Sequence, residues 1–288
     1  MRAIHLKCLC LMLPLLIVGS FFQSRALAGA FVLQEMSWVE VGEYLKENDM
    51  IIIPLGSTEQ HGPHLPLGSD YYQAFEISKK ISERTGVIVA PILMVGYSEY
   101  HAGFPGVLSI KPETMTQVLF ESIEFLIEDG FRRIMFMNGH GGNAIVQENL
   151  IHRINQTTEA VAVALDTEGT EEEYLDWHSG KTETSKMLYL MPSLVRMEKA
   201  EKPTMRFTAR MERLQAHAKN NPELDKVFTA LLGTREQTKK GGASHEFSSN
   251  GIWTLSDLQS VSEALGKQNV DIVVDKAVKF IEAWREAE

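Results

Sequence analysis

Short apolar stretches alternate with helical patterns along most of this chain, and this alternation constrains the fold more than any other feature. Four stretches are continuously apolar and rich in bulky or β-branched residues, as buried parallel strands are. They lie at residues 51–55, 87–90, 133–137 and 160–165. Because helical segments separate them, the sequence predicts an α/β fold: three αβα layers around a mostly parallel central sheet.

The expected helices follow from apolar spacing and from proline and glycine at their ends. Pro112 opens one helix and Gly130 ends it, and Gly86 ends the helix before it. The predicted helices cover residues 34–47, 71–83, 112–129, 144–155, 256–266 and 270–286. Residues 195–247 break the rhythm. We interpret them as an insertion or lid beside the active site, with a solvated peripheral helix as the alternative.

The first 28 residues are typical of an export signal. A basic start with Arg2 and Lys7 precedes an apolar run at 8–18 that is too short to span a bilayer comfortably. A small-x-small cleavage site follows at 26–28. The alternative is an uncleaved membrane anchor. We predict a signal peptide at 1–28 and one domain at 29–288, periplasmic or secreted and free of the membrane after cleavage.

Composition excludes two classes of function. Both cysteines, Cys8 and Cys10, lie in the predicted signal, so the mature domain has no disulfide or thiol chemistry. Any metal in it must be held by histidine and carboxylate. The whole chain has a formal charge of −10, and the signal carries only basic charges. Such an acidic domain argues against nucleic acid as a partner.

Two carboxylates and two imidazoles are concentrated in the loop after the first predicted strand. Glu59 and His61 are two residues apart, which places both side chains on one side of an extended segment. Asp70 follows at the end of the loop. Mixed carboxylate and imidazole ligands suit Zn, Mn or Fe(II) better than Mg or Ca. The alternative is a polar surface loop in which Asp70 only caps the next helix.

Two further polar loops carry histidine. The strand at 133–137 runs into Asn-Gly-His-Gly-Gly-Asn, which contains His140. If this strand and the first one are parallel, both loops leave the same carboxyl edge, where open α/β sheets bind ligands. A third stretch, at 176–185, adds His178 and Glu183 before a helix.

These motifs resemble the creatininase (creatinine amidohydrolase) family. The matching features are Glu-x-His with a later Asp, Asn-Gly-His, His-x-Gly-x-x-Glu-Thr-Ser and a Pro-Gly loop at 97–106, in that family's order. The resemblance covers roughly residues 36–286. It implies two divalent metal ions, Zn, Mn or Fe, bridged by one carboxylate and by a water. It also implies a homo-oligomer, such as a hexamer, that acts on a small molecule.

The resemblance also assigns roles to individual residues. Glu59 and His140 would bind one metal, His61 would bind the other, and Asp70 would bridge them. His178 would deliver a proton to the leaving nitrogen, which needs a group that titrates near neutral pH. Glu183 would bind metal or orient His178.

One position departs from the pattern. The creatinine-hydrolysing member has a metal-binding Glu two residues after the loop histidine, where this chain has Gly142. The second site then lacks a ligand unless Glu183 or solvent replaces it, and the Gly-Gly pair would offer N–H groups to an anionic substrate. We therefore expect hydrolysis of a C–N bond in a small cyclic amide, formamide or related substrate. The alternative is a degenerate family member that binds a small ligand in the periplasm without turnover.

Several other side chains remain open from the sequence. His101 would contact substrate or pack against Phe104, and Trp177 would line the pocket or belong to the core. His64 is expected to be structural, and His245 is a candidate for the lid.

Overall fold

The computed structural model describes residues 30–169, 176–218, 220–231 and 244–288. Four parallel strands form its central sheet, in the order β2-β1-β3-β4. They are β1 (Met50–Leu55), β2 (Ile88–Val89), β3 (Arg133–Asn138) and β4 (Val161–Ala164). All four lie within one residue of the apolar stretches that predicted them. The predicted signal at 1–28 falls outside the described residues.

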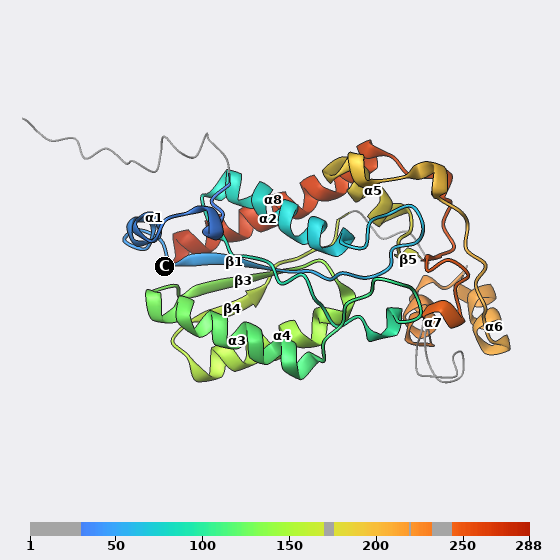
Figure 1. Cartoon of the computed structure of the whole chain (residues 1–288), viewed down its shortest axis with the longest axis horizontal. Helices are drawn as coiled ribbons and strands as arrows, with labels where there is room; N and C mark the ends of the chain where they lie inside the picture. Colours follow the sequence, from blue (N-terminus) through green and yellow to red (C-terminus); the bar gives the residue numbers. More distant parts are fainter. Residues whose placement is uncertain (1–29, 170–175, 219, 232–243) are drawn as a thin grey trace, which may run out of the picture.

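Alternate side chains of each strand enter two different cores, which makes the molecule three-layered. Ile51 and Ile53 of β1 pack with α3 (Pro112–Asp129) and α4 (Ala144–Thr157). Met50 and Ile52 pack on the other face with α2 (Ser69–Thr85) and α8 (Glu263–Ala287). Figure 1 shows these two helix pairs on opposite sides of the sheet. The predicted αβα fold is confirmed.

Local sequence explains where most helices begin and end. Ser37 and Glu40 form a capping box at the start of α1 (Trp38–Tyr44), which is shorter than the predicted helix at 34–47. Pro112 is the first residue of α3, and Gly130 follows its end with φ 120°. The short 3₁₀ helices are Leu33–Glu35, Glu99–His101, Gly141–Asn143, Pro192–Leu194, Met197–Lys199, Pro222–Leu224, Ser244–Glu246 and Leu258–Ser260.

The prediction of two carboxyl-terminal helices is wrong. One helix, α8, runs from Glu263 to Ala287, and the segment before it is only a 3₁₀ turn. The first of the two predicted helices, at 256–266, ended at Gly266, but this residue lies inside α8. A Cβ at Gly266 would stand 1.8 Å from the Ser185 carbonyl oxygen in α5 (Lys181–Leu190). This glycine therefore allows α5 and α8 to approach each other closely.

We expect Gly266→Ala to lower the free energy of unfolding by about 1–3 kcal/mol, because the added methyl group would collide with the backbone of α5. Urea unfolding measures the change. Gly42→Ala is the matched control, since Gly42 lies in α1 with no neighbour within 4 Å of its Cβ position. Alanine is a better helix former and should leave stability unchanged or raise it by up to about 1 kcal/mol. Equal effects at both positions would contradict the packing argument.

A second, antiparallel sheet of two strands lies beyond the central one. It pairs β5 (Asp176–His178) with β6 (Trp253–Thr254) and was not predicted. Beside it lie α6 (Ala209–Ala218) and α7 (Asp225–Leu231), both within the predicted insertion. The ring of Trp177 stacks on Phe228 of α7 at 5.2 Å and belongs to a small apolar cluster there. Trp177 is thus a partly buried residue that packs against the apolar cluster of this region.

Within the described ranges, no helix combines the length and the apolar character that crossing a bilayer requires.

Candidate metal centre

The six residues predicted for the site come together at the carboxyl edge of the central sheet. Glu59 and His61 lie in the loop after β1, and His140 follows β3. His178 ends β5, and Glu183 is in the first turn of α5. Asp70, also in a first turn, belongs to α2, whose N-cap is Gly68 with no side-chain cap. The capping alternative for Asp70 is therefore wrong.

Asp70 lies between two histidines and faces each with a different oxygen. Its Oδ1 is 3.0 Å from Nε2 of His61, and its Oδ2 is 3.1 Å from Nδ1 of His140. Glu59 Oε2 is 3.3 Å from the same His140 nitrogen. Glu183 Oε2 is 3.8 Å from His61 Nε2.

Three groups of side chains in the described part of the chain have ligand atoms close enough to hold a metal ion. They are Glu59, Asp70 and His140; His61, Asp70 and Glu183; and Glu59, His61 and His178. The first two groups share Asp70. Two carboxylate oxygens of the cluster, Asp70 Oδ2 and Glu59 Oε1, are buried and accept no hydrogen bond from the described residues. A histidine nitrogen lies 3.1 Å from each of these two oxygens. Such oxygens fit a bound cation.

Three of these histidines have an outer nitrogen that faces a backbone carbonyl. His61 Nδ1 lies 3.2 Å from the Glu59 oxygen, and His178 Nε2 lies 2.7 Å from that of Gln60. His140 Nε2 lies 2.9 Å from the oxygen of Tyr97. A carbonyl only accepts, so each outer nitrogen donates its N–H. The inner nitrogen therefore faces the carboxylates, and once it gives up any hydrogen of its own it can bind a metal, as metal-binding histidines are held.

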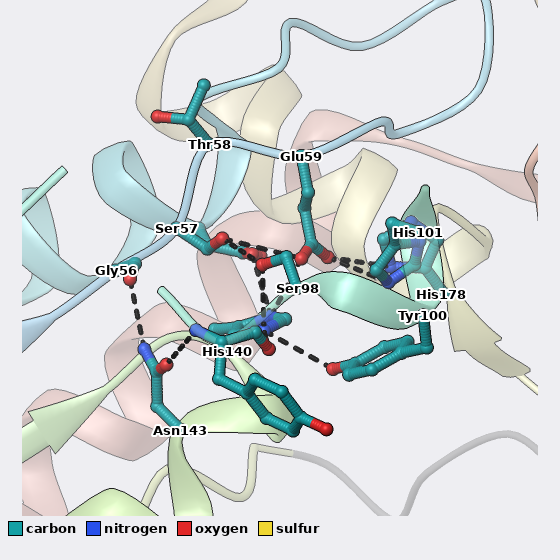
Figure 2. Close-up of polar contacts among 12 residues, drawn as sticks. Gly56, Ser57, Thr58, Glu59, Ser98, Tyr100, His101, His140, Asn143 and His178 are labelled. Atoms are coloured by element: carbon teal, nitrogen blue, oxygen red, sulfur yellow. Dashed lines mark hydrogen bonds and ion pairs between the residues drawn. The ribbon is translucent and has the colours of Figure 1, made fainter. Parts of the chain in front are cut away.

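Figure 2 shows how Glu59 and His140 meet the Pro-Gly loop. Ser98 Oγ lies 3.3 Å from His140 Nε2 and 2.5 Å from Ser57 Oγ. The hydroxyl of Tyr100 lies 3.2 Å from the same nitrogen of His140. The loop thus surrounds the outer side of the His140 ring.

Carboxylates and histidines in the cluster shift each other's protonation. Burial lowers the pKa of His61, but the charge and hydrogen bond of Asp70 outweigh burial and raise it to about 10. Burial opposes the same change at His140, where Glu59 and Asp70 raise the pKa well above its usual value. Burial raises the pKa of Glu59, but the positive charge of His140 and the hydrogen bonds of the neighbouring histidines hold it well below its usual range.

Glu183 and His178 behave differently. Burial raises the pKa of Glu183 to about 7, although its Oε2 accepts a 2.6 Å hydrogen bond from the N–H of Ser179. Ser179 itself has a positive φ of 55°, a conformation that is uncommon outside glycine. Burial lowers the pKa of His178 well below its usual value, and the positive charge of His61 lowers it further. His178 is therefore a neutral imidazole in this environment.

Gly142 has no room for a side chain. A Cβ there would lie 2.2 Å from the Tyr97 carbonyl oxygen and 2.5 Å from the Tyr100 hydroxyl. Atoms of Tyr97 and Tyr100 thus fill the space beside Gly142, and the contact of the Gly-Gly N–H groups with an anionic substrate stays a prediction. Gly141, by contrast, has no neighbour within 4 Å of its Cβ position. Tyr100 thus occupies the space that a side chain at position 142 would need. After Asp70, the side-chain carboxylate nearest to His61 is that of Glu183.

The remaining sequence candidates lie outside the cluster or at its margin. His64 is buried, with Nε2 2.9 Å from Thr184 Oγ1, which fits the structural role expected for it. His245 is exposed and lies 3.0 Å from the Ala102 carbonyl on the Pro-Gly loop. His101, left open by the sequence, contacts Glu59, and Gln60 was missed altogether. The only sequence sign of Gln60 was its place between Glu59 and His61.

Comparison with known families agrees with this arrangement. The family model described as creatininase, creatinine amidohydrolase, matches residues 34–281. The chain belongs to the creatininase family.

Curated creatininase-family relatives differ in what their names say they act on. A 3-dehydro-scyllo-inosose hydrolase of Thermotoga maritima is 31% identical over 180 residues, which is 57% of this chain and 58% of that protein. A mycofactocin precursor peptide peptidase of Mycobacterium tuberculosis is 36% identical over 166 residues, 52% of this chain and 61% of its own. The matched regions thus span less than two thirds of these two relatives. The creatinine amidohydrolase of Pseudomonas putida is 29% identical, over 57% of this chain and 74% of its own.

Solved creatininase structures share the fold over nearly the whole chain. One described as "Creatininase Mn" superposes with a TM-score of 0.67 at 23% identity and covers 90% of this chain and 98% of its own. A creatininase variant described as Zn-Zn type gives a TM-score of 0.65 at 23% identity, covering 89% and 97%. These likenesses establish the creatininase fold.

Proposed function

We propose that this creatininase-family protein is a metal-dependent amidohydrolase that cleaves a C–N bond of a small cyclic amide, formamide or related substrate. The observation that supports this most directly is Asp70, whose two oxygens face two separate carboxylate–histidine groups. One carboxylate shared in this way suits a pair of divalent ions, with Zn, Mn or Fe as the candidates for this ligand set.

The residues present fit the implied ions. Glu59, His140 and Asp70 would hold one ion, and His61, Asp70 and Glu183 would hold the other. Such ions would lower the pKa of a coordinated water and polarise a substrate carbonyl. In this assignment Glu183 replaces the ligand that position 142 lacks.

His178 is the residue that we propose for proton transfer. Its inner nitrogen, Nδ1, lies 3.7 Å from Glu59 Oε1 and 3.9 Å from Glu183 Oε2, so it faces the metal-binding carboxylates. Its outer nitrogen donates to the Gln60 carbonyl and cannot take part. A neutral imidazole first accepts a proton from the attacking water and then donates it to the leaving nitrogen. Nδ1 is the atom that would carry this proton.

Screening with metal-loaded protein tests the proposal. Purified protein loaded in turn with Zn, Mn and Fe is assayed for ammonia or amine release from small lactams, formamides and imides. We expect turnover with at least one substrate class and none after chelation. The alternative, a family member that binds a small ligand without turnover, would show as two bound ions and no release from any compound in the panel.

Metal loading should release protons at neutral pH. The pKa of His61 is raised to about 10, and that of His140 is raised as well. Both rings are therefore in the positively charged imidazolium form at pH 7 in the metal-free protein. A histidine must be neutral to bind metal, so loading both ions should release about two protons. The apparent affinity should therefore rise with pH above neutrality. Calorimetric titrations in buffers of different ionisation enthalpy measure the number of protons released. A titration without proton release would contradict the raised pKa values of His61 and His140.

We also propose export and self-assembly. The predicted leader at 1–28 supports a periplasmic or secreted protein whose amino terminus lies near Gly29. Sequencing the amino terminus of the purified native protein tests this, and a cytoplasmic protein that begins at Met1 would contradict it.

Exposed Trp38 and Phe125, 85% and 70% accessible, support a homo-oligomer such as a hexamer. Light scattering at micromolar concentration would contradict that if it showed a monomer.

A further inference from the structure

Besides His61, His140 and His178, the buried His101 approaches the cluster from the Pro-Gly loop, and its surroundings differ from those of these three. Its inner nitrogen, Nε2, lies 3.1 Å from Glu59 Oε1. Its outer nitrogen, Nδ1, lies 2.8 Å from Nε2 of the Gln60 side chain. The outer partner is thus an amide group, where the other three histidines have a backbone carbonyl.

The orientation of the Gln60 amide follows from its other two partners. Gln60 Oε1 accepts a 3.1 Å hydrogen bond from the backbone N–H of Gly62. On the opposite side, Gln60 Nε2 donates to the Gly251 carbonyl at 2.8 Å. An N–H needs an acceptor and a carbonyl needs a donor, so a flipped amide would lose both bonds. The group that faces His101 is therefore the NH₂.

Counting hydrogens then determines the tautomer of His101. The NH₂ of Gln60 has two hydrogens, and its two shortest contacts, both 2.8 Å, are to the Gly251 oxygen and to His101 Nδ1. His178 Nε2, at 3.1 Å, does not compete, because it donates its own hydrogen to the Gln60 carbonyl. His101 Nδ1 accordingly accepts a hydrogen bond with its lone pair. A neutral imidazole with a bare Nδ1 carries its hydrogen on Nε2.

We propose that Gln60 is a positioning residue that holds His101 with its Nε2–H turned toward Glu59, so that His101 supports this carboxylate and does not bind metal. The inference rests on the proposed metal centre. His101 would place a positive N–H edge beside Oε1 of Glu59, while Oε2 faces His140. Outer contacts of this kind orient metal-binding groups.

The same amide connects the site to a distant part of the chain. Gly251 has a φ of 85°, and a Cβ there would lie 1.8 Å from Gln60 Oε1. Close packing of Gly251 on Gln60 therefore fixes the amide from the segment that leads into β6. His101 stacks on Trp253 of that strand at 4.8 Å, with 19° between the planes.

Nitrogen NMR of ¹⁵N-histidine-labelled protein tests the tautomer directly, in the metal-free and in the zinc-loaded state. The His101 signals are assigned from their loss in His101→Gln. We expect a protonated Nε2 and an unprotonated Nδ1 in the wild type. In Gln60→Glu a carboxylate oxygen faces Nδ1, so the hydrogen should move to Nδ1. Gln259→Glu, the same change at an exposed position, should leave the His101 signals unaltered. A wild-type His101 protonated on Nδ1 would overturn the inference, as would an unchanged tautomer in Gln60→Glu.

Zinc affinity separates positioning from ligation. Gln60→Met keeps the size of the side chain but removes the donor, so chelator competition should show zinc binding about 10- to 100-fold weaker. The number of ions bound at saturation should not change, because no ligand has been removed. Loss of a whole site in Gln60→Met would overturn the positioning role. If the wild type bound no zinc, the proposed function would fail, whereas the spectra of the metal-free protein would still test Gln60.

Discussion

Asp70→Ala should remove both metal ions and reduce hydrolysis to background. Asp70 is the only side chain of the described residues that belongs to both groups proposed to hold the two ions. Without its charge, two cations would repel each other across the gap and each would lose a ligand. Metal analysis by mass spectrometry, together with the amine-release assay, measures both effects. Asp129→Ala, at the exposed end of α3, is the control and should keep metal and activity.

His178→Ala gives the comparison that separates binding from chemistry. If His178 only transfers a proton, the variant should keep most of its metal but turn over about 10²–10⁴-fold more slowly. The geometry also permits His178 to be a ligand, since it forms a third possible group with Glu59 and His61. Metal loss as complete as in Asp70→Ala would make His178 a ligand and contradict the proposed role. Full metal and full activity in both variants would place the site elsewhere.

Gly142→Ala should weaken metal binding although it changes no ligand. Its methyl group would stand 2.2 Å from the Tyr97 oxygen, which accepts the outer N–H of His140. Moving that carbonyl frees the His140 ring, and losing such an outer contact costs about 10- to 100-fold in metal affinity. We expect unfolding free energy to fall by about 1–3 kcal/mol as well, because the site is overpacked.

Gly141→Ala is the matched control for this variant. It makes the same chemical change one residue earlier, where no atom lies within 4 Å of the Cβ position. Chelator competition and urea unfolding on both variants give the comparison. Wild-type zinc affinity in Gly142→Ala would show that the contact between Tyr97 and His140 does not hold the ring in place.

Sequence pattern was sufficient for the layers and for the convergence of the main site residues. Continuous apolar stretches predicted the four strands, because parallel strands are covered on both faces. The polar loops after β1 and β3 then had to meet, since parallel neighbours end at the same edge, and Leu55 pairs with Asn138 there. Glu59, His61, Asp70 and His140 were found for that reason.

Pattern failed where a residue's role depends on a partner far away in the chain. Gly266 resembles a helix stop in sequence, yet its reason for being glycine is the backbone of Ser185 in another helix. Gly142 stands out in the sequence only as the position without the expected Glu, and the structure shows atoms of Tyr97 and Tyr100 where its Cβ would lie. Both glycines are explained by steric contacts, which no local propensity encodes.

The sequence by itself determined the αβα layers, the carboxyl edge that holds the site and most of the residues there. The reason is that burial produces a regular spacing of apolar residues, and the alternation of strands with helices indicates parallel strands. Only the tertiary structure decided how each imidazole is oriented. Gln60 meets Gly251 across 191 positions and His101 across 41, and these contacts decide whether a nitrogen presents a hydrogen or a lone pair to the carboxylates. That distinction separates a histidine that binds metal from one that orients a metal-binding carboxylate. It depends on hydrogen-bond geometry, which produces no regular pattern in the sequence.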